Sequence, residues 1–537
     1  MVDFKQPLPV IKRRNSNSKN SDPEIFREDN KLLKLDENID EHSQEFSSTI
    51  LKRLLLSLQK KININQELRI KYPEQPEKFM ESEIELYEEI QNFSVLATAP
   101  DLLPEFIESK VFTLTIQLLA HENADISSAV VQLFFELTDD EVLTDFPDEA
   151  NTLIEALVKD NFILLLYQNI IRMDEKNADD STCVHSTLGI LENFTSLEPK
   201  LCETIVDSSE FLPWLLGRIR VKQFDQNKLY ASEILSILLH HGEIISRKLG
   251  EMGGIDSLLR SLAHYRNKDP KDSEEIELLN NLFDSLCSCL LVKENKKHFL
   301  QEEGIELLII MLKEKKMASV GAVKVLNYCF TGGNEFEACK KFVDQFGLKS
   351  LFPKFMKPPK KFIKGLEVND FEESVVCIIY DMLRAFSENS AYKTRVLGKF
   401  IESDMIKIER LVELHEKYFE QIQKCRKAIE AEKMELQLEG KKLTEYDTAR
   451  FEMKEYDAGL NTLRLVDYLL CYLCASEVPE FQVRIYKLFD QKQKRITEFL
   501  ATLEDNIKDL ENASTEDTDK AARDVKAMKE LLLKIKR

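Results

Sequence analysis

Residues 128–137 read SAVVQLFFEL, and this stretch decides the fold class. Its apolar residues cover nearly the whole circumference of a helix, so it predicts a helix packed between neighbours rather than an amphipathic surface helix. Four later runs have the same character: residues 184–194, 230–239, 282–291 and 322–330. Helices that are buried on several sides and recur along a chain are typical of a repeat array, in which each unit buries its neighbour.

A second type of helical segment precedes each of these runs, and a sixth example follows the last one. The six segments begin at Val111, Phe162, Phe211, Ile255, Ile305 and Leu348, with spacings of 51, 49, 44, 50 and 43 residues. Gly254, Gly304 and Gly347 stand directly before three of them, which predicts a tight corner between two helices. A period of about 40–50 residues lies in the armadillo and HEAT range. The sequence therefore predicts an all-α, right-handed α-solenoid of armadillo/HEAT-like repeats.

The composition agrees with a helical protein. The 537 residues include only 15 glycines and 15 prolines, fewer than an all-β sandwich or a doubly wound α/β enzyme uses for its turns. Ten cysteines follow no disulfide framework, and no apolar stretch approaches the ~20 residues of a membrane span. We expect a soluble protein of a reducing compartment, with no secretory leader and no membrane contact.

Four regions are predicted along the chain. Residues 1–48 are a polar, disordered tail in which Lys12, Arg13 and Arg14 could form a nuclear localisation signal. Residues 49–100 form an N-terminal helical cap and residues 101–400 the armadillo-like repeats. Residues 401–537 form a C-terminal helical region, with one long charged helix over 408–457 and an apolar helix over 459–475.

The negative charge is concentrated in one block. The chain carries a net charge of −21, and residues 81–180 alone hold 23 acidic and 4 basic side chains. Such a block repels the phosphates of nucleic acids and attracts basic partners. The alternative is an acidic face that serves only solubility. On the first interpretation we expect a basic protein partner and no direct nucleic-acid binding.

No group of residues suits catalysis, a cofactor or a metal ion. The pairs Gly253-Gly254 and Gly332-Gly333 lack the Lys-Ser/Thr that a phosphate-binding loop needs. His240 and His241 are adjacent and point to different faces of a helix, whereas a helical metal pair needs i, i+3 or i, i+4 spacing. Cys471 and Cys474 have CxxC spacing but no second pair nearby. We expect a protein that is not an enzyme and needs no cofactor.

Several stretches resemble the beta-catenin-like protein 1 family. They are residues 227–235, 281–290, 312–316, 324–326, 341–344 and 457–460. The resemblance implies a nuclear, non-enzymatic armadillo-repeat protein that associates with the spliceosome through the nineteen complex. It further implies binding to basic, localisation-type segments of splicing factors, including a Myb-domain cell-division-cycle protein.

The last helix of each armadillo repeat lines the concave groove, and import receptors carry a ladder of Trp and Asn there. The apolar spacing places Glu136, Asn193 and Asn327 at the Asn position, with Gln132, Gly189 and Val323 at the Trp position. The single tryptophan, Trp214, is expected in the core of the second helix of its repeat. The ladder is thus absent, and charge must replace stacking. The candidate groove residues are Glu136, Asp139, Asp140, Glu141, Asn193 and Asn327.

Two other classes of armadillo protein compete with this interpretation. A nuclear transport adaptor would also bind basic import signals, but the missing Trp ladder argues against it. An adhesion-type armadillo protein has a basic groove for acidic tails, and the acidic block has the opposite sign. Self-association into a homo-oligomer is left open.

Overall fold

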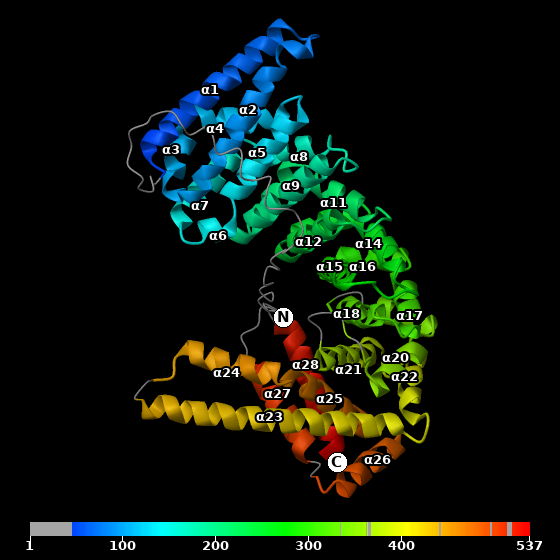
Figure 1. The fold of residues 1–537 in the computed structure, drawn as a ribbon. Coiled ribbons are helices and arrows are strands. Elements are labelled where there is room, and N and C mark those ends of the chain that lie inside the picture. Colours follow the sequence, from blue (N-terminus) through cyan, green and yellow to red (C-terminus); the bar gives the residue numbers. More distant parts are fainter. Residues whose placement is uncertain are drawn as a thin grey trace. The chain divides into compact units, whose positions relative to one another are not determined.

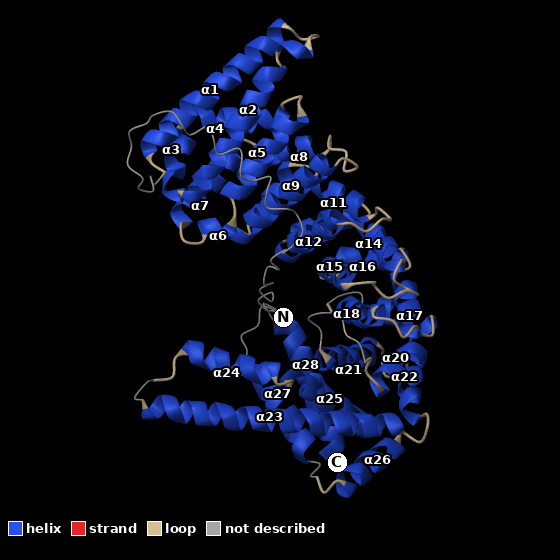
Figure 2. Ribbon diagram, viewed as in Figure 1, coloured by secondary structure: helices blue, strands red, loops and turns tan. Residues whose placement is uncertain are grey.

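The computed structural model describes residues 46–332, 335–360, 362, 367–439, 442–494, 497–512 and 518–536. These ranges contain helices and no strand (Figure 2), which confirms the all-α prediction. The proposed localisation residues Lys12, Arg13 and Arg14 lie outside the described ranges. Within those ranges, no helix is long and apolar enough to cross a membrane. The chain divides between Glu210 and Phe211 into two compact units, which we call the N-terminal and C-terminal units.

The N-terminal unit is built from ten α-helices and four short 3₁₀-helices in its described part. The α-helices are α1 (Ser48–Lys71), α2 (Met80–Asn92), α3 (Leu103–Glu108), α4 (Lys110–Gln117), α5 (Ala124–Leu137), α6 (Asp140–Leu143), α7 (Pro147–Lys159), α8 (Phe162–Ile170), α9 (Ala178–Leu197) and α10 (Leu201–Ser208). The 3₁₀-helices are η2 (Pro76–Lys78), η3 (Phe93–Thr98), η4 (Pro100–Leu102) and η5 (Leu118–Ala120).

A line of phenylalanines runs through the core of this unit. Consecutive rings lie 4.8–6.1 Å apart between centroids, a range in which edge and tilted ring contacts are favourable. The rings are those of Phe93, Phe106, Phe112, Phe134, Phe162 and Phe194. Around this line α1 packs on α2, α2 on α5, and α5 on α9 (Figure 1).

The C-terminal unit continues the array and then departs from it. Its helices are α11 (Phe211–Ile219), α12 (Gln226–His241), α13 (Glu243–Glu251), α14 (Gly254–Ala263), α15 (Ser273–Cys289), α16 (Lys293–Gln301), α17 (Gly304–Lys313), α18 (Ala318–Phe330), α19 (Glu335–Asp344), α20 (Gly347–Met356), α21 (Val368–Ala385), α22 (Ala391–Ile401), α23 (Ile406–Leu438), α24 (Glu445–Asp457), α25 (Leu460–Ala475), α26 (Pro479–Gln491), α27 (Thr497–Asn512) and α28 (Thr518–Lys536).

Three helices form each repeat between α13 and α21, and the third helices stack side by side. In order, α12, α15, α18 and α21 each pack against the next (Figure 1). The five nearly all-apolar runs noted in the sequence belong to α5, α9, α12, α15 and α18, as predicted. The six segments that precede or follow them belong to α4, α8, α11, α14, α17 and α20. The half-buried Trp214 lies on α11, the second helix of its repeat.

The corner glycines Gly304 and Gly347 let two helices approach each other closely. The residue with a left-handed backbone is the one directly before each glycine. A Cβ on Gly304 would lie 2.3 Å from Phe299 Cε2, and one on Gly347 would lie 2.4 Å from Phe342 Cε2. The left-handed residues are Glu303 and Phe346, with φ of 58° and 61°. At these two corners an aromatic ring of the preceding helix therefore covers the first residue of the next helix, where only glycine leaves room.

The single long helix predicted over residues 408–457 is wrong, because two helices occupy this region. Helix α23 ends at Leu438 and α24 begins at Glu445. Thr444 caps α24: its hydroxyl accepts from Asp447 N at 3.1 Å, and the Asp447 carboxylate accepts from Thr444 N at 3.0 Å. This capping box offers the backbone a better start for a new helix than a continuation of the old one.

Helix α25 corresponds to the apolar helix predicted over residues 459–475, and it is buried by its neighbours. It packs against α21 on one side and against α23, α26, α27 and α28 elsewhere. On the α21 side, Asn461 Nδ2 and Thr462 Oγ1 each donate to Glu373 at 2.7 Å. Helix α25 therefore continues the line of third helices beyond α21. The helices around it, α23, α26, α27 and α28, cover α25.

A buried ion pair joins α23 to α25. His415 Nδ1 lies 2.6 Å from Asp467 Oδ1, and both side chains are almost fully buried. Burial opposes the charged imidazole, but the charge and the hydrogen bond of Asp467 outweigh it and raise the pKa of His415. Burial also raises the pKa of Asp467. The rings of Phe419 and Phe489 lie against the imidazole.

Gly304→Ala should lower the free energy of unfolding by about 1–3 kcal/mol, because the added methyl group collides with the buried Phe299 ring. The matched control is Glu303→Gly, which should raise stability by about 1 kcal/mol by removing left-handed strain from a non-glycine residue. Urea unfolding followed by circular dichroism measures both. Equal midpoints for wild type and Gly304→Ala would contradict the close approach.

His415→Leu should cost about 3–5 kcal/mol, because it leaves the Asp467 carboxylate buried without its partner. His415→Leu/Asp467→Leu should be destabilised by less than the sum of its two single variants. Thermal unfolding of the four proteins in this cycle measures the coupling. Strict additivity would show that the pair is not coupled.

The pair should also make stability depend on pH. A raised pKa in the folded state means that stability from protonated His415 is complete below about pH 6.5 and is lost as the pH rises through the folded value. The difference in thermal midpoint between wild type and the double leucine variant should therefore be more favourable to wild type at pH 6 than at pH 9.

Candidate interaction surface

The third helices of the N-terminal unit leave one stripe of each helix uncovered. On α5 the exposed or half-buried positions include Gln132 and Glu136, and the stripe continues past the helix end to Asp139. On α9 they include His185 and Glu192. Positions three, four or seven apart on a helix share a face, so each set forms one continuous line.

The two helices run parallel with a constant register. Ser186 Oγ donates to Gln132 Oε1 at 3.0 Å, and Asn193 Nδ2 donates to Thr138 Oγ1 at 3.4 Å. The paired residues are 54 and 55 apart in sequence. Asp139 therefore lies beside the turn of α9 that carries Glu192, and we call Glu136, Asp139, Asp140 and Glu192 the acidic surface.

The predicted acidic residues lie together at the end of α5 and the start of α6. Glu136 is half-buried and accepts a hydrogen bond from Gln132 Nε2 at 2.8 Å. Asp139 and Asp140 are also half-buried. Glu141 is the second residue of α6, but its side chain lies outside the described ones. The structure thus brings three of the predicted carboxylates to one end of a third helix.

Asn193 does not line this surface. Its side chain is 2% exposed, and its amide donates to Thr138, whose hydroxyl in turn donates to Phe134 O at 2.7 Å. The residue fixes α9 against the end of α5. The outward position next to it is Glu192, so the expected helix phase is off by one residue in α9.

Two of the three Trp positions of the import-receptor ladder are closed by packing, and the third, Gln132, is exposed but carries no ring. A Cβ on Gly189 would lie 2.3 Å from Phe135 Cε2, so α9 approaches α5 too closely for any side chain there. In α18 the corresponding Val323 is fully buried. Asn327 is half-buried, and its Oδ1 is shielded without a hydrogen-bond partner among the described residues. Neither helix offers a site for ring stacking on lysine stems.

The buried positions of α9 show why Glu192 and not Asn193 faces outward. Val184, Leu188, Leu191 and Phe194 are buried, and they mark the covered face of α9. The uncovered face then holds His185 and Glu192. The apolar spacing along the sequence had placed Asn193 at this position, one residue from the outward side chain.

The surroundings of the acidic surface are depleted of positive charge. Residues 111–158 and 177–199, which include α5, α6 and α9, contain no lysine and no arginine. In the C-terminal unit the equivalent stripe is different, because Lys324 Nζ donates to Asp284 Oδ1 at 2.7 Å between α18 and α15. The stripe that lies in sequence stretches without lysine or arginine thus belongs to the N-terminal unit.

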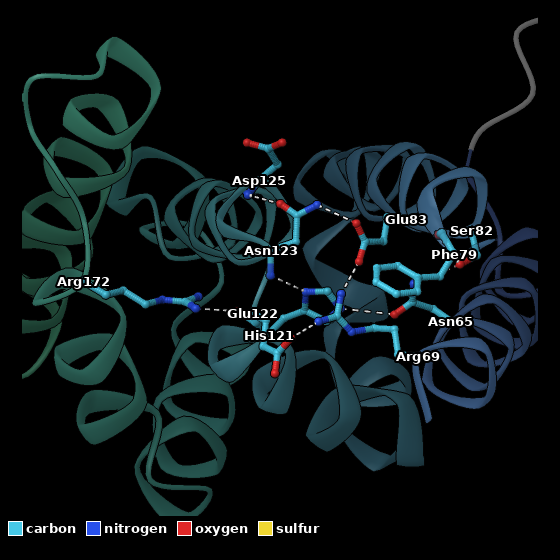
Figure 3. Close-up of polar contacts among 10 residues, drawn as sticks. All are labelled: Asn65, Arg69, Phe79, Ser82, Glu83, His121, Glu122, Asn123, Asp125 and Arg172. Carbon is cyan, nitrogen blue, oxygen red and sulfur yellow. Dashed lines mark hydrogen bonds and ion pairs between the residues drawn. The ribbon is translucent and has the colours of Figure 1, made fainter. Parts of the chain in front are cut away.

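Sequence reasoning missed a polar network that joins α1, α2 and the turn before α5. Arg69 pairs with Glu83 and Glu122, and its guanidinium lies 4.8 Å from the centre of the Phe79 ring (Figure 3). Asn123 donates to Glu83 Oε2 at 2.9 Å and caps α5 by accepting from Asp125 N. The N-cap pattern Asn-Ala-Asp was the available clue.

His121 lies at the centre of this network as a neutral imidazole. Its Nδ1 accepts from Asn123 N at 3.0 Å, so the proton is on Nε2, which donates to Asn65 Oδ1 at 3.1 Å (Figure 3). Burial, and then the charge of Arg69, lower the pKa of His121. Arg172, which follows α8, donates to the backbone carbonyl of His121. All these groups tie helices together, and their arrangement serves structure.

The cysteine pair of α25 is also structural. Cys471 and Cys474 are buried, and burial raises the pKa of Cys474 to about 12. Among the described residues, no group of three or more His, Cys, Asp or Glu side chains is placed to hold a metal ion. His240 and His241 end α12, as predicted.

Comparisons with known proteins agree with this architecture. The model of a family described as "Catenin-beta-like, Arm-motif containing nuclear" matches residues 29–504. Human beta-catenin-like protein 1 is 40% identical over 448 residues, which cover 83% of this chain and 79% of the human protein. The beta-catenin-like protein 1 homolog of Schizosaccharomyces pombe is 33% identical over 486 residues, 90% of this chain and 83% of the yeast protein.

A solved chain from the crystal complex of SYS-1 and POP-1 is 13% identical, with a TM-score of 0.44, and the match covers 90% of this chain and 85% of that one. The family match extends over most of the chain, from before α1 to α27. The expected resemblance is thereby confirmed, and the chain belongs to the beta-catenin-like protein 1 family.

Proposed function

We propose that this protein is a non-enzymatic nuclear adaptor of the pre-mRNA splicing machinery. Its acidic surface would bind basic, localisation-type segments of splicing factors, including components of the nineteen complex and a Myb-domain cell-division-cycle protein. Membership of an armadillo-type family supports a protein-interaction scaffold, and the family description includes the word nuclear. The individual partners come from the resemblance.

The observation that supports the proposal is the concentration of carboxylates at the ends of α5 and α9 and the start of α6. Two stretches that together hold these helices lack lysine and arginine, and the block 81–180 has 23 acidic against 4 basic side chains. Because Gly189 and Val323 leave no room for stacking rings, a basic peptide would be held mainly by charge. Charge-based binding is fast, and it weakens as salt screens the carboxylates.

Asp139→Lys/Asp140→Lys/Glu141→Lys should weaken binding of a basic peptide by more than about tenfold, because it reverses three charges at one end of the surface. Fluorescence anisotropy with a fluorescein-labelled peptide rich in lysine and arginine measures this at low and high salt. Wild-type binding should fall as salt increases, and the variant should be much less sensitive to salt.

The matched control reverses three exposed carboxylates of the C-terminal unit: Glu251→Lys/Glu302→Lys/Glu477→Lys. This control changes the net charge equally and should leave affinity within about twofold. Glu192→Lys provides a second, single change on α9 that avoids the α5–α6 junction. If the triple variant folds by circular dichroism and binds as wild type does, the proposal is wrong.

A nuclear transport adaptor is the alternative function, since it would bind the same class of peptide. It requires binding to the general import carrier as well. A pull-down from nuclear extract distinguishes the two: splicing factors that leave at high salt support the splicing adaptor, whereas import carriers alone support the transport function.

A further inference from the structure

A pocket of about 1070 Å³ opens in the C-terminal unit between the end of α17, the loop before α18 and helix α20. It is separate from the acidic surface, which belongs to the other unit. Its lining contains seven lysines and one aspartate, and we call it the basic pocket. The lysines are Lys313, Lys315, Lys316, Lys349, Lys354, Lys357 and Lys360.

The positive charge of the basic pocket is largely unbalanced. Among the described residues, one carboxylate forms an ion pair with a lysine of the pocket. It is Asp269, whose Oδ2 lies 3.5 Å from Lys316 Nζ. Asp269 also accepts from Met317 N at 2.9 Å, so it holds the loop in place. One carboxylate with a structural role therefore faces seven ammonium groups.

Lys354 shows the consequence of this imbalance most directly. Its half-buried Nζ donates to Ser319 Oγ at 3.0 Å and to Glu314 O at 3.3 Å, which are both neutral acceptors. Burial, and then the charge of Lys315, lower the pKa of Lys354. An anion entering the pocket would meet an ammonium group that already has its geometry fixed and lacks a counter-charge.

Phe346 adds an apolar group at the edge of the pocket. It is the left-handed residue of its corner, and its side chain is 68% exposed. The same corner position is Gly253 in one repeat and Glu303 in the next, so neither packing nor the turn requires a large ring here. A strained, exposed phenylalanine beside a pocket is a feature of binding sites rather than of cores.

The other lining residues favour a peptide over a nucleic acid. Leu312, Met317, Pro353, Pro358 and Pro359 give the pocket aliphatic walls. Among the described residues that line it, Phe346 is the single aromatic one and none is arginine. Single-stranded nucleic acid, by contrast, is usually held by several stacking rings and by guanidinium groups. Lysines around an aliphatic floor match a chain that alternates carboxylates with apolar side chains.

We propose that the basic pocket binds an acidic segment of a partner protein, with aspartate or glutamate residues on the lysines and an apolar side chain against Phe346 and the prolines. The proposal is independent of the proposed function, because it concerns a different unit and a ligand of the opposite charge. The protein would then hold a basic segment and an acidic segment at two separate surfaces.

The test is fluorescence anisotropy on the full chain with a fluorescein-labelled peptide in which glutamates flank a central Leu-Phe-Leu. Lys349→Glu/Lys357→Glu should weaken binding by at least about tenfold, since both lysines are exposed and line the pocket. The matched control, Lys293→Glu/Lys297→Glu, makes the same charge change at exposed positions of α16 and should stay within about twofold of wild type.

The variant Phe346→Ala distinguishes the contribution of the apolar contact to peptide binding from the contribution of the lysine charges. It should weaken binding by a similar factor at low and high salt, because an apolar contact is not screened. The proposal is overturned if the pocket variant and the control lose affinity equally. It is also overturned if a labelled oligouridylate binds more tightly than the peptide and is lost in the same pocket variant, since the site would then be one for nucleic acid.

Discussion

The close approach of neighbouring third helices is the constraint on which the repeat array depends. Gly189 lies under the ring of Phe135, and Gly321 lies under the ring of Phe283, where a Cβ would be 2.3 Å and 2.2 Å from the nearest ring carbon. At this separation only small residues or hydrogen-bonding pairs fit between the helices. Each third helix is left with one narrow stripe that can meet a partner.

The stripe explains why function and fold can be separated in this molecule. Packing determines which residues can occupy the buried positions, because a close-packed core of large apolar side chains tolerates little change in side-chain volume. The stripe positions are constrained by neither packing nor backbone geometry, and they differ between the units. In the N-terminal unit they carry carboxylates, whereas in the C-terminal unit Asp284 and Lys324 neutralise each other.

The repeat character and most helix positions could be predicted from the sequence, because runs such as 128–137 and 322–330 are too apolar for any surface helix. The acidic cluster at Asp139 and Asp140 could also be predicted, since charge along a chain needs no fold to be counted. The phase of α9 could not. Asn193 and Glu192 are both polar, and the choice between them depends on Thr138, which lies 55 residues away.

Long-range partners also explain the other omissions. The network of Arg69, Glu83 and His121 brings together side chains from three separate segments, and no local pattern announces it. The basic pocket likewise combines α17, α20 and the loop that Asp269 fixes. The break between α23 and α24 could have been predicted, because the Thr-x-x-Asp pattern at Thr444 is a recognisable helix start.

Helix α25 sets the length of the array. An open stack of helices presents a ready surface on its last member, much as a sheet presents an unpaired edge strand. Here the last member, α25, is wrapped by α23, α26, α27 and α28, and its Asn461 and Thr462 side chains donate to Glu373 of α21. The same wrapping that stabilises α25 also covers the end of the line of third helices, as a terminal cap does in a repeat array.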